Sequence, residues 1–355
     1  MDYRDSYSGR WRLSCIGGVT LNQKAYITHI AYELPECIVE NEKGRLRRKT
    51  GIVHRHICSN DETASDLAVR AAEKLFANGV DRSCVNFVIF CTQSFDYPLP
   101  TTACLIQDRL HLSKHVGATD IDLGCSGYEY ALGLAKGLIE SGQVKNVLLL
   151  TGETYSKYIH PEDNTVVPLF GDAATATLIE GAEADASGIQ GMTYGTDGSG
   201  YQNLIVPIGG MRYRWQDTQI EETIDKYGNK RTNRNLYMNG SAIMNFALEV
   251  VPPCVDEILQ KTGVTKEEVD YYVFHQANHF MLQYLQQKCD LLDANYWNDV
   301  KDYGNTVSNS IPIAIHDMMR ANPDKDLHHV MLIGFGVGLS WSGCMVDLRR
   351  CHISL

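Results

Sequence analysis

Long hydrophobic runs are missing from this chain of 355 residues, and their absence excludes several classes of protein. No run approaches the roughly 20 apolar residues that a membrane-spanning helix needs. Residues 1–23 are polar, contain several arginines and lack the apolar core of a secretion signal. There is no low-complexity tract either. We therefore expect a cytoplasmic protein with no membrane partner.

An excess of positive charge is also missing, since the formal net charge is -11. A phosphate backbone or an anionic membrane attracts a positively charged surface, so nucleic acid is not expected as a partner.

Paired cysteines are lacking too: the eleven cysteines are an odd number and contain no C-x-x-C pair. This pattern favours a reducing compartment over a disulfide framework or a metal site, and no metal is expected.

What the chain does contain is enough apolar residues for a large core, 44% of the total, arranged as alternating strands and helices. Such alternation predicts a mainly parallel sheet. After an N-terminal extension, residues 1–23, we expect two halves, residues 24–184 and 185–355. The elements predicted for the first half are strands at 25–31, 85–91, 116–121, 146–151 and 173–180, and helices at 62–78, 101–111 and 126–141.

The two halves resemble each other, because similar segments recur about 180 residues apart in the same order. Asp122–Ser126 matches Asp302–Thr306 at the aspartate and the glycine, so Asn305 stands opposite Cys125. A second match sets His275 opposite Cys91. The matched pairs are 122–126 with 302–306, 80–94 with 264–278, and 146–150 with 329–333.

Cys125 is the strongest candidate nucleophile, because it lies between two glycines at a turn that leads into a predicted helix. Unpaired N–H groups and the macrodipole at a helix N-terminus favour a thiolate. His275 and Asn305 also follow predicted strands or precede helices. Such ends meet at one edge of a parallel sheet, so thiol, imidazole and amide are expected to converge. Taken singly, the cysteine and histidine would more often be core or surface residues, and Asn305 could be a helix cap.

The glycine-rich segment 334–341 lacks the G-x-G-x-x-G spacing and a following helix, which argues against a dinucleotide site. Its glycines, Gly336 among them, would let the backbone approach a substrate closely. An N–H group of this segment, together with that of Cys125, could bind a developing oxyanion. A tight turn between strands is the alternative interpretation.

Several ordered motifs together resemble the β-ketoacyl-acyl-carrier-protein synthase III family. They span about residues 25–347. The motifs are D-x-G-Cys125-S-G, Phe170-Gly171-Asp172-Ala173, His275-Gln276-Ala277-Asn278, Gly304-Asn305-Thr306-x-Ser308-x-Ser310-Ile311-Pro312 and Gly334-Phe335-Gly336-x-Gly338-x-Ser340-Trp341.

The resemblance implies an α/β protein of the thiolase fold, with two βαβαβ-type halves in a five-layer αβαβα arrangement, usually as a homodimer. It implies that Cys125 accepts an acyl group from a thioester donor, and that His275 and Asn305 then assist decarboxylative Claisen condensation with a malonyl thioester on acyl carrier protein. The N–H groups of Cys125 and Val337 would form the oxyanion hole, and Asn278 would hold the pantetheine arm. No cofactor is expected to stay bound.

The resemblance also assigns Leu99 to the acyl pocket across the dimer, with core packing as the alternative. Two alternatives to condensation remain open: acyl transfer to an alcohol or amine without decarboxylation, and a non-catalytic carrier-binding partner of another ketosynthase.

The chain departs from the best-known members of the family where they bind coenzyme A. The segment 40–49 has no tryptophan, Lys49 replaces an arginine, and Asn164 stands near the position of a second arginine. Phe280 takes the place of an arginine that binds the carrier. The donor, coenzyme A or carrier protein, therefore stays open, as does its chain length. A basic run with Arg47, Arg48 and Lys49 is either a carrier or phosphate contact or a solvated loop. Residues 209–234 are expected to form a surface insertion or mobile loop.

Overall fold

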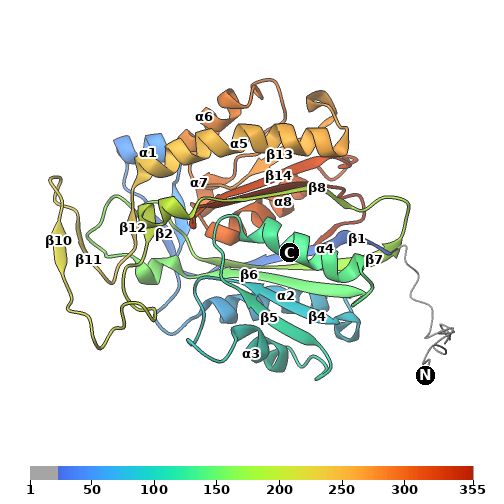
Figure 1. Cartoon of the computed structure of the whole chain (residues 1–355), viewed down its shortest axis with the longest axis horizontal. Helices are drawn as coiled ribbons and strands as arrows, with labels where there is room; N and C mark the ends of the chain where they lie inside the picture. The colour runs from blue at the N-terminus through green and yellow to red at the C-terminus, as the bar shows by residue number, and fades with distance from the viewer. Residues whose placement is uncertain (1–22, 355) are drawn as a thin grey trace, which may run out of the picture.

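Two large β-sheets run through residues 23–354, the part of the chain that a computed structural model describes, and helices cover both faces of each of them (Figure 1). The predicted N-terminal extension lies outside the described residues except for Gln23, which begins the first strand. Every element predicted between residues 25 and 151 is present, with ends that differ by at most two residues. The segment 38–56, for which no element was predicted, forms two short strands and a helix.

The larger sheet has six strands in the order β16-β1-β7-β6-β4-β5. Strands β4, β5 and β6 are parallel, whereas β7 runs antiparallel to both β6 and β1. Strand β5 forms one edge. The strands are β1 (Gln23–Glu33), β4 (Phe87–Cys91), β5 (Gly117–Ile121), β6 (Asn146–Glu153), β7 (Ala173–Glu183) and β16 (His352–Ser354).

The smaller sheet repeats the same pairing in the order β13-β14-β15-β8. Strands β13 and β14 are parallel, β15 is antiparallel to β14, and β8 is antiparallel to β15. A parallel bridge from Tyr272 to Tyr296 occupies the place that β5 has beside β4. The strands are β8 (Ile189–Thr196), β13 (Tyr271–Phe274), β14 (Val330–Gly336) and β15 (Ser340–Val346). The repeat that the sequence predicted is therefore a repeat of strand topology.

The helices form three layers that alternate with the two sheets, which gives the predicted five-layer αβαβα arrangement (Figure 1). Apolar residues of the outer helices pack on one sheet each, and those of the middle pair pack on both sheets. The outer layers are α2 (Ala64–Ala77) with α3 (Thr102–Arg109), and α5 (Gly240–Thr262) with α6 (His279–Lys288). The middle layer is α4 (Gly127–Glu140) with α8 (Ser310–Ala321).

The remaining elements are short and lie in the connections. The strands are β2 (Ile38–Glu40), β3 (His54–His56), β9 (Leu204–Ile205), β10 (Glu222–Ile224), β11 (Lys230–Thr232) and β12 (Tyr237–Met238), and the α-helices are α1 (Arg45–Thr50) and α7 (Val300–Tyr303). The 3₁₀ helices are η1 (Arg82–Cys84), η2 (Tyr155–Tyr158), η3 (Gly198–Asn203), η4 (Lys266–Glu268) and η5 (Val307–Asn309). Between residues 23 and 354, no helix is both long and apolar enough to cross a bilayer.

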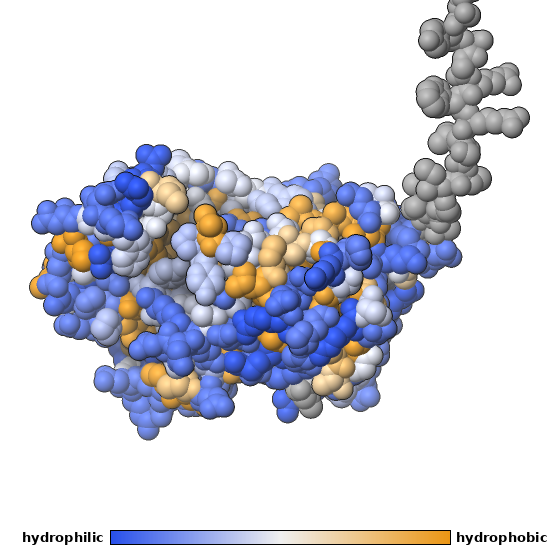
Figure 2. Space-filling model, turned by 90° about the horizontal axis from the view of Figure 1, so that it is seen from below, coloured by the Kyte–Doolittle hydropathy of each residue, from blue (hydrophilic) through white to orange (hydrophobic). Residues whose placement is uncertain are grey.

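Residues 209–234 lie on the surface, as predicted, but they contain the hairpin β10–β11 rather than only loop (Figure 1). Several of their large hydrophobic side chains are exposed, including Met211, Ile224 and Tyr227. On the face of the molecule seen in Figure 2, hydrophobic residues form separate patches on a mainly hydrophilic surface.

Candidate active site

One cavity of about 760 Å³ is lined by all three residues that the sequence singled out, Cys125, His275 and Asn305. Cys125 belongs to the first half of the chain, and His275 and Asn305 belong to the second. Each follows the end of an element: Cys125 comes after β5, His275 directly after β13, and Asn305 two residues after α7. The predicted convergence of thiol, imidazole and amide is therefore confirmed.

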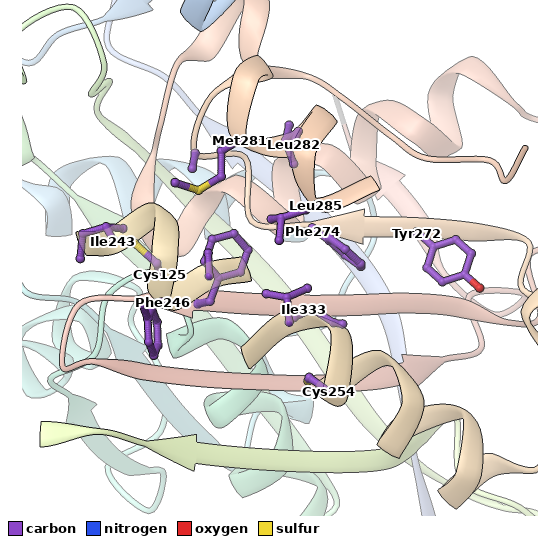
Figure 3. Close-up of a cluster of buried hydrophobic side chains, with 14 of the residues drawn as sticks. Cys125, Ile243, Phe246, Cys254, Tyr272, Phe274, Met281, Leu282, Leu285 and Ile333 are labelled. Carbon is purple, nitrogen blue, oxygen red and sulfur yellow. The ribbon is translucent and has the colours of Figure 1, made fainter. Parts of the chain in front are cut away.

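Cys125 lies in the turn between β5 and α4, two residues before the helix begins at Gly127. Its side chain is buried, with 5% of its surface exposed, and it joins the hydrophobic cluster beneath α5 and α6. Figure 3 shows this cluster, to which Ile243 and Phe246 of α5 also belong. The sulfur therefore sits in apolar surroundings while it lines the cavity.

Burial decides the protonation of this thiol, because it raises the pKa of Cys125 to about 12. The backbone N–H groups of Val337 and of Cys125 itself lower the pKa, but by less, and Glu153 raises it further. The expectation that the helix N-terminus would favour a thiolate is thus wrong for the free protein. Desolvation of the sulfur outweighs the favourable N–H groups, and the thiol form predominates at neutral pH.

His275 is held from several sides. Its backbone N–H donates to Ile333 O on β14 at 2.9 Å, and its ring meets Phe335 edge to face with 5.5 Å between centroids. Nδ1 lies 2.7 Å from Ser310 Oγ, which leaves Nε2 for the cavity. Burial lowers the pKa of His275 to about 3, so the imidazole is neutral over the physiological range.

Asn305 is fixed by both its backbone and its side chain. Its N–H donates to Leu169 O at 2.8 Å, and its C=O accepts from Gly171 N–H at 3.0 Å. Its Oδ1 accepts from Val307 N–H at 2.9 Å, which leaves the Nδ2 donors for the cavity. Val307 has a φ of 57°, which is unusual for a β-branched residue, so the turn after Asn305 is strained.

Gly336 ends β14 and faces the nucleophile closely. A methyl group at this position would lie 2.7 Å from Cys125 Cβ and 2.8 Å from Cys125 Sγ. The turn after Gly336 brings the Val337 N–H near the sulfur, where it lowers the pKa of Cys125. The glycine-rich segment 334–341 therefore does both things considered from sequence: it turns between β14 and β15, and it approaches the reactive sulfur.

The walls of the cavity contain both apolar and polar residues. Apolar residues come from the start of α5 and from the segments that precede it. These residues are Leu169, Phe170, Leu204, Met238, Ile243 and Met244. Polar residues, including Asn239, Ser241 and Asn245, line the same region of the chain. The cavity can therefore accept an acyl chain beside a polar carrier arm.

Lys49 and Phe280, two departures from the family pattern, contact each other at the cavity. The Lys49 Nζ lies 4.2 Å from the centre of the Phe280 ring, and both residues line the cavity. Arg47 instead donates to Glu40 Oε1 at 2.7 Å and to Asn41 O at 2.9 Å, and it does not line the cavity. Arg48 is exposed on the same short helix α1.

Asn278 and Leu99 differ in where they lie. Asn278 lines the cavity and caps α6, because its Oδ1 accepts from Met281 N–H at 2.9 Å. The Nδ2 group of Asn278 takes no part in this cap. Leu99 is 79% exposed in the connection between β4 and α3, and it does not line the cavity of its own chain. The alternative of core packing for Leu99 is therefore wrong.

The sequence analysis missed a buried carboxyl beneath the site. Glu153 accepts hydrogen bonds from Gln93 N–H at 3.1 Å, Ser94 Oγ at 2.8 Å and Ser308 Oγ at 3.3 Å. Burial raises the pKa of Glu153 to about 8. Its position at the end of buried strand β6 was the signal that could have found it.

No three histidine, cysteine, aspartate or glutamate side chains gather as metal ligands within residues 23–354.

Sequence comparisons match this chain to one family of known proteins. Profiles described as 3-oxoacyl-[acyl-carrier-protein (ACP)] synthase III and its C-terminal domain match residues 119–198 and 259–348. A β-ketoacyl-[acyl-carrier-protein] synthase III of Clostridium perfringens is 33% identical over 324 residues, which cover 88% of this chain and 96% of the relative. That of Clostridioides difficile is 31% identical, with 92% and 99% covered.

Solved structures agree with this. A 3-oxoacyl-(acyl-carrier-protein) synthase III superposes with a TM-score of 0.88 at 45% identity and covers 91% of this chain and 99% of that structure. A 3-oxoacyl-(acyl-carrier protein) synthase from Burkholderia xenovorans has a TM-score of 0.85 at 34% identity, with 94% and 96% covered.

Proposed function

The chain belongs to the 3-oxoacyl-acyl-carrier-protein synthase III family, and on that premise we propose which of its residues perform the family's acyl-transferring condensation. Cys125 takes an acyl group from a thioester donor. His275 and Asn305 then bind the carbonyl oxygen of a malonyl thioester while it loses carbon dioxide. The observation that carries this assignment is the single cavity lined by all three residues.

The reaction proceeds in two steps. In the first, the sulfur of Cys125 attacks the donor carbonyl, the donor thiol leaves, and the thiol proton passes to it. In the second, the bond between the malonyl methylene and its carboxylate breaks, and the electron pair forms an enolate. The enolate carbon then attacks the acyl group, and Cys125 leaves as a thiolate that takes up a proton.

Neutral donors suit this chemistry. The pKa of His275 is lowered to about 3, so the ring does not form an ion pair with the malonyl carboxylate that must depart. Hydrogen bonds from His275 and from Asn305 Nδ2 instead strengthen as negative charge develops on the thioester oxygen. The N–H groups of Cys125 and Val337 would bind the oxyanion of the tetrahedral intermediate, and loss of one such donor typically costs about 10²- to 10³-fold in rate.

The polar residues of the cavity suit a carrier arm. The Nδ2 of Asn278 is left free by the capping role of its Oδ1 and would hold the pantetheine. Lys49 at the cavity and Arg48 on the exposed face of α1 would meet the phosphate of phosphopantetheine or an acidic acyl carrier protein. Substrates would thus arrive on acyl carrier protein or coenzyme A, with no resident cofactor.

A homodimer is supported by the edge of the larger sheet. Among the described residues, β5 pairs with β4 on one side and with no strand on the other. Three large side chains are exposed in the connection between β4 and α3, namely Phe95, Tyr97 and Leu99. An exposed edge with apolar neighbours favours pairing with a second copy. Leu99 would then reach the acyl pocket of the partner, and residues 24–184 and 185–355 would form the two halves of each protomer.

The test is to follow both steps by intact-protein mass spectrometry. The purified protein is incubated with acyl-coenzyme A and acyl-carrier donors, and malonyl carrier protein is then added. We expect acylation of Cys125, then release of carbon dioxide and a carrier product longer by two carbons. Cys125→Ala should show neither step. Acylation without release of carbon dioxide, or full activity of Cys125→Ala, would contradict the proposal.

A further inference from the structure

The hydroxyl of Ser310 lies between two groups of the His275 loop. Ser310 is the first residue of α8 and is buried, with 3% of its surface exposed. Its Oγ is 2.7 Å from His275 Nδ1 and 3.3 Å from the backbone nitrogen of Gln276. Within residues 23–354, these are the two hydrogen-bond partners of the hydroxyl.

The direction of these hydrogen bonds follows from what each group can do. The N–H of Gln276 can only donate, so Oγ of Ser310 accepts there. The single proton of the hydroxyl then has His275 Nδ1 as its acceptor, because a buried hydroxyl proton needs a partner. Nδ1 therefore holds the lone pair, and the proton of the neutral ring is on Nε2.

The tautomer matters because the ring is neutral. Burial lowers the pKa of His275 to about 3, so a ring protonated at both nitrogens is not available at neutral pH. With the proton on Nε2, the ring donates into the cavity. With the proton on Nδ1, it would present a lone pair to the oxygen on which negative charge develops, and the two would repel each other.

We propose that Ser310 is a positioning residue that fixes the Nε2–H tautomer of His275 and so makes this ring a hydrogen-bond donor to the enolate. The inference rests on the proposed function and adds how the two hydrogen-bond donors to the enolate are supplied. The short segment 305–310 supplies one donor directly, through Asn305, and sets the protonation of the other through Ser310. The acylation of Cys125 does not need this donor.

The experiment separates the two steps in the wild type, Ser310→Ala, Ser310→Thr and Ser342→Ala. Ser342 is the matched control, because its buried hydroxyl donates to Thr193 O at 2.8 Å, outside the site. We expect Ser310→Ala to acylate Cys125 normally, while release of carbon dioxide by the pre-acylated protein falls about 10- to 100-fold, the range typical when a metal-bound histidine loses the partner that fixes its tautomer. Ser310→Thr should restore the rate, and Ser342→Ala should keep both steps.

The tautomer is read separately, from the ¹⁵N chemical shifts of His275 in histidine-labelled protein. The inference expects Nε2–H in the wild type and a mixture in Ser310→Ala. A wild-type Nδ1–H ring, or unchanged release of carbon dioxide in Ser310→Ala, would overturn it. A wild type that shows Nε2–H but never releases carbon dioxide would count against the proposed function and not against the tautomer assignment.

Discussion

Burial sets the protonation of the residues around the cavity. It raises the pKa of Cys125 to about 12 and of Glu153 to about 8, and it lowers that of His275 to about 3. All three shifts favour the uncharged form. At neutral pH the free site therefore contains a thiol and a neutral imidazole, and negative charge at the reacting atoms appears only as the reaction proceeds.

The thiol form of Cys125 can be tested by alkylation. Because the thiolate is the reactive form, we expect the rate of reaction with iodoacetamide to rise about tenfold per pH unit above neutrality without reaching a plateau near pH 9. The rate is measured by mass spectrometry of the Cys125 peptide. The denatured protein is the control, and there the rate should level off near the ordinary cysteine pKa of about 8.5. A plateau near neutral pH in the folded protein would contradict the burial argument.

His275 links stability to pH. An ordinary histidine has a pKa of about 6.5, whereas folding lowers that of His275 to about 3. Between these values the unfolded state binds more protons, so the contribution is complete above about pH 6.5 and is lost as the pH falls toward 3. We expect His275→Gln to reduce the loss of stability between pH 7.5 and pH 5. Urea unfolding at pH 7.5 and at pH 5 measures this loss of stability. The control is His115→Gln, a substitution of an exposed histidine, which should leave the loss as it is in the wild type.

At the scale of elements, glycine on β14 decides how closely the strand approaches the nucleophile. A methyl group at position 336 would meet the Cys125 side chain at 2.7–2.8 Å, closer than atoms can pack. We expect Gly336→Ala to remain folded but to acylate Cys125 at least about 100-fold more slowly, because the sulfur must move from its place. The rate of acylation measures this.

Gly137 on α4 is the matched control for that substitution. A methyl group there has no atom within 4 Å. Gly137→Ala should therefore gain about 0.5–1 kcal/mol of stability from helix propensity and acylate normally. Equal acylation rates in the two variants would contradict the role given to Gly336.

Helix α1 tests how a carrier approaches. Arg48 is exposed and Lys49 lines the cavity, whereas Arg47 is held by Glu40. We expect charge reversal at Arg48 and Lys49 to raise the KM for malonyl carrier protein severalfold, because an acidic carrier loses its attraction. Turnover of a small malonyl thioester should change little. Unchanged carrier kinetics would remove α1 from the docking surface.

Sequence patterns predicted the regular elements better than the irregular ones. Strands such as β6 and helices such as α4 follow from apolar periodicity that tertiary contacts reinforce. No bounds were predicted for any helix after residue 184. In α5 two prolines, Pro252 and Pro253, lie inside the helix, where proline ordinarily ends one. The hairpin β10–β11 is mostly exposed, so no apolar alternation marked its strands.

In the candidate site too, the residues in local sequence patterns were predicted and the contacts made by packing were not. Cys125, His275 and Asn305 were predicted because each follows a strand or begins a helix in a repeated pattern. The hydrogen bond from Ser310 to His275 joins residues 35 positions apart, and the bond from Ser308 to Glu153 spans 155. Such contacts depend on packing, which no local pattern encodes.

At the scale of the whole molecule, the edge strand β5 and the exposed Leu99 lead to a test of the dimer. If a second copy pairs there, Leu99→Asp places a charge in the interface and should shift the protein toward the mass of one chain, 39.7 kDa. Light scattering after size exclusion measures the mass. Leu292→Asp is the control, since Leu292 is 66% exposed in the connection after α6. A wild type that is already monomeric would contradict the dimer.

One pair of matched positions in the two halves, Cys125 and Asn305, lies at the same cavity. Two identical half-chains joined as a symmetric pair would have the same side chain at each such position. Once both copies lie on a single gene, each position can change alone, and here Cys125 stands where its counterpart is Asn305. The matched positions therefore carry different chemical tasks, a nucleophile in the first half of the chain and an amide donor in the second.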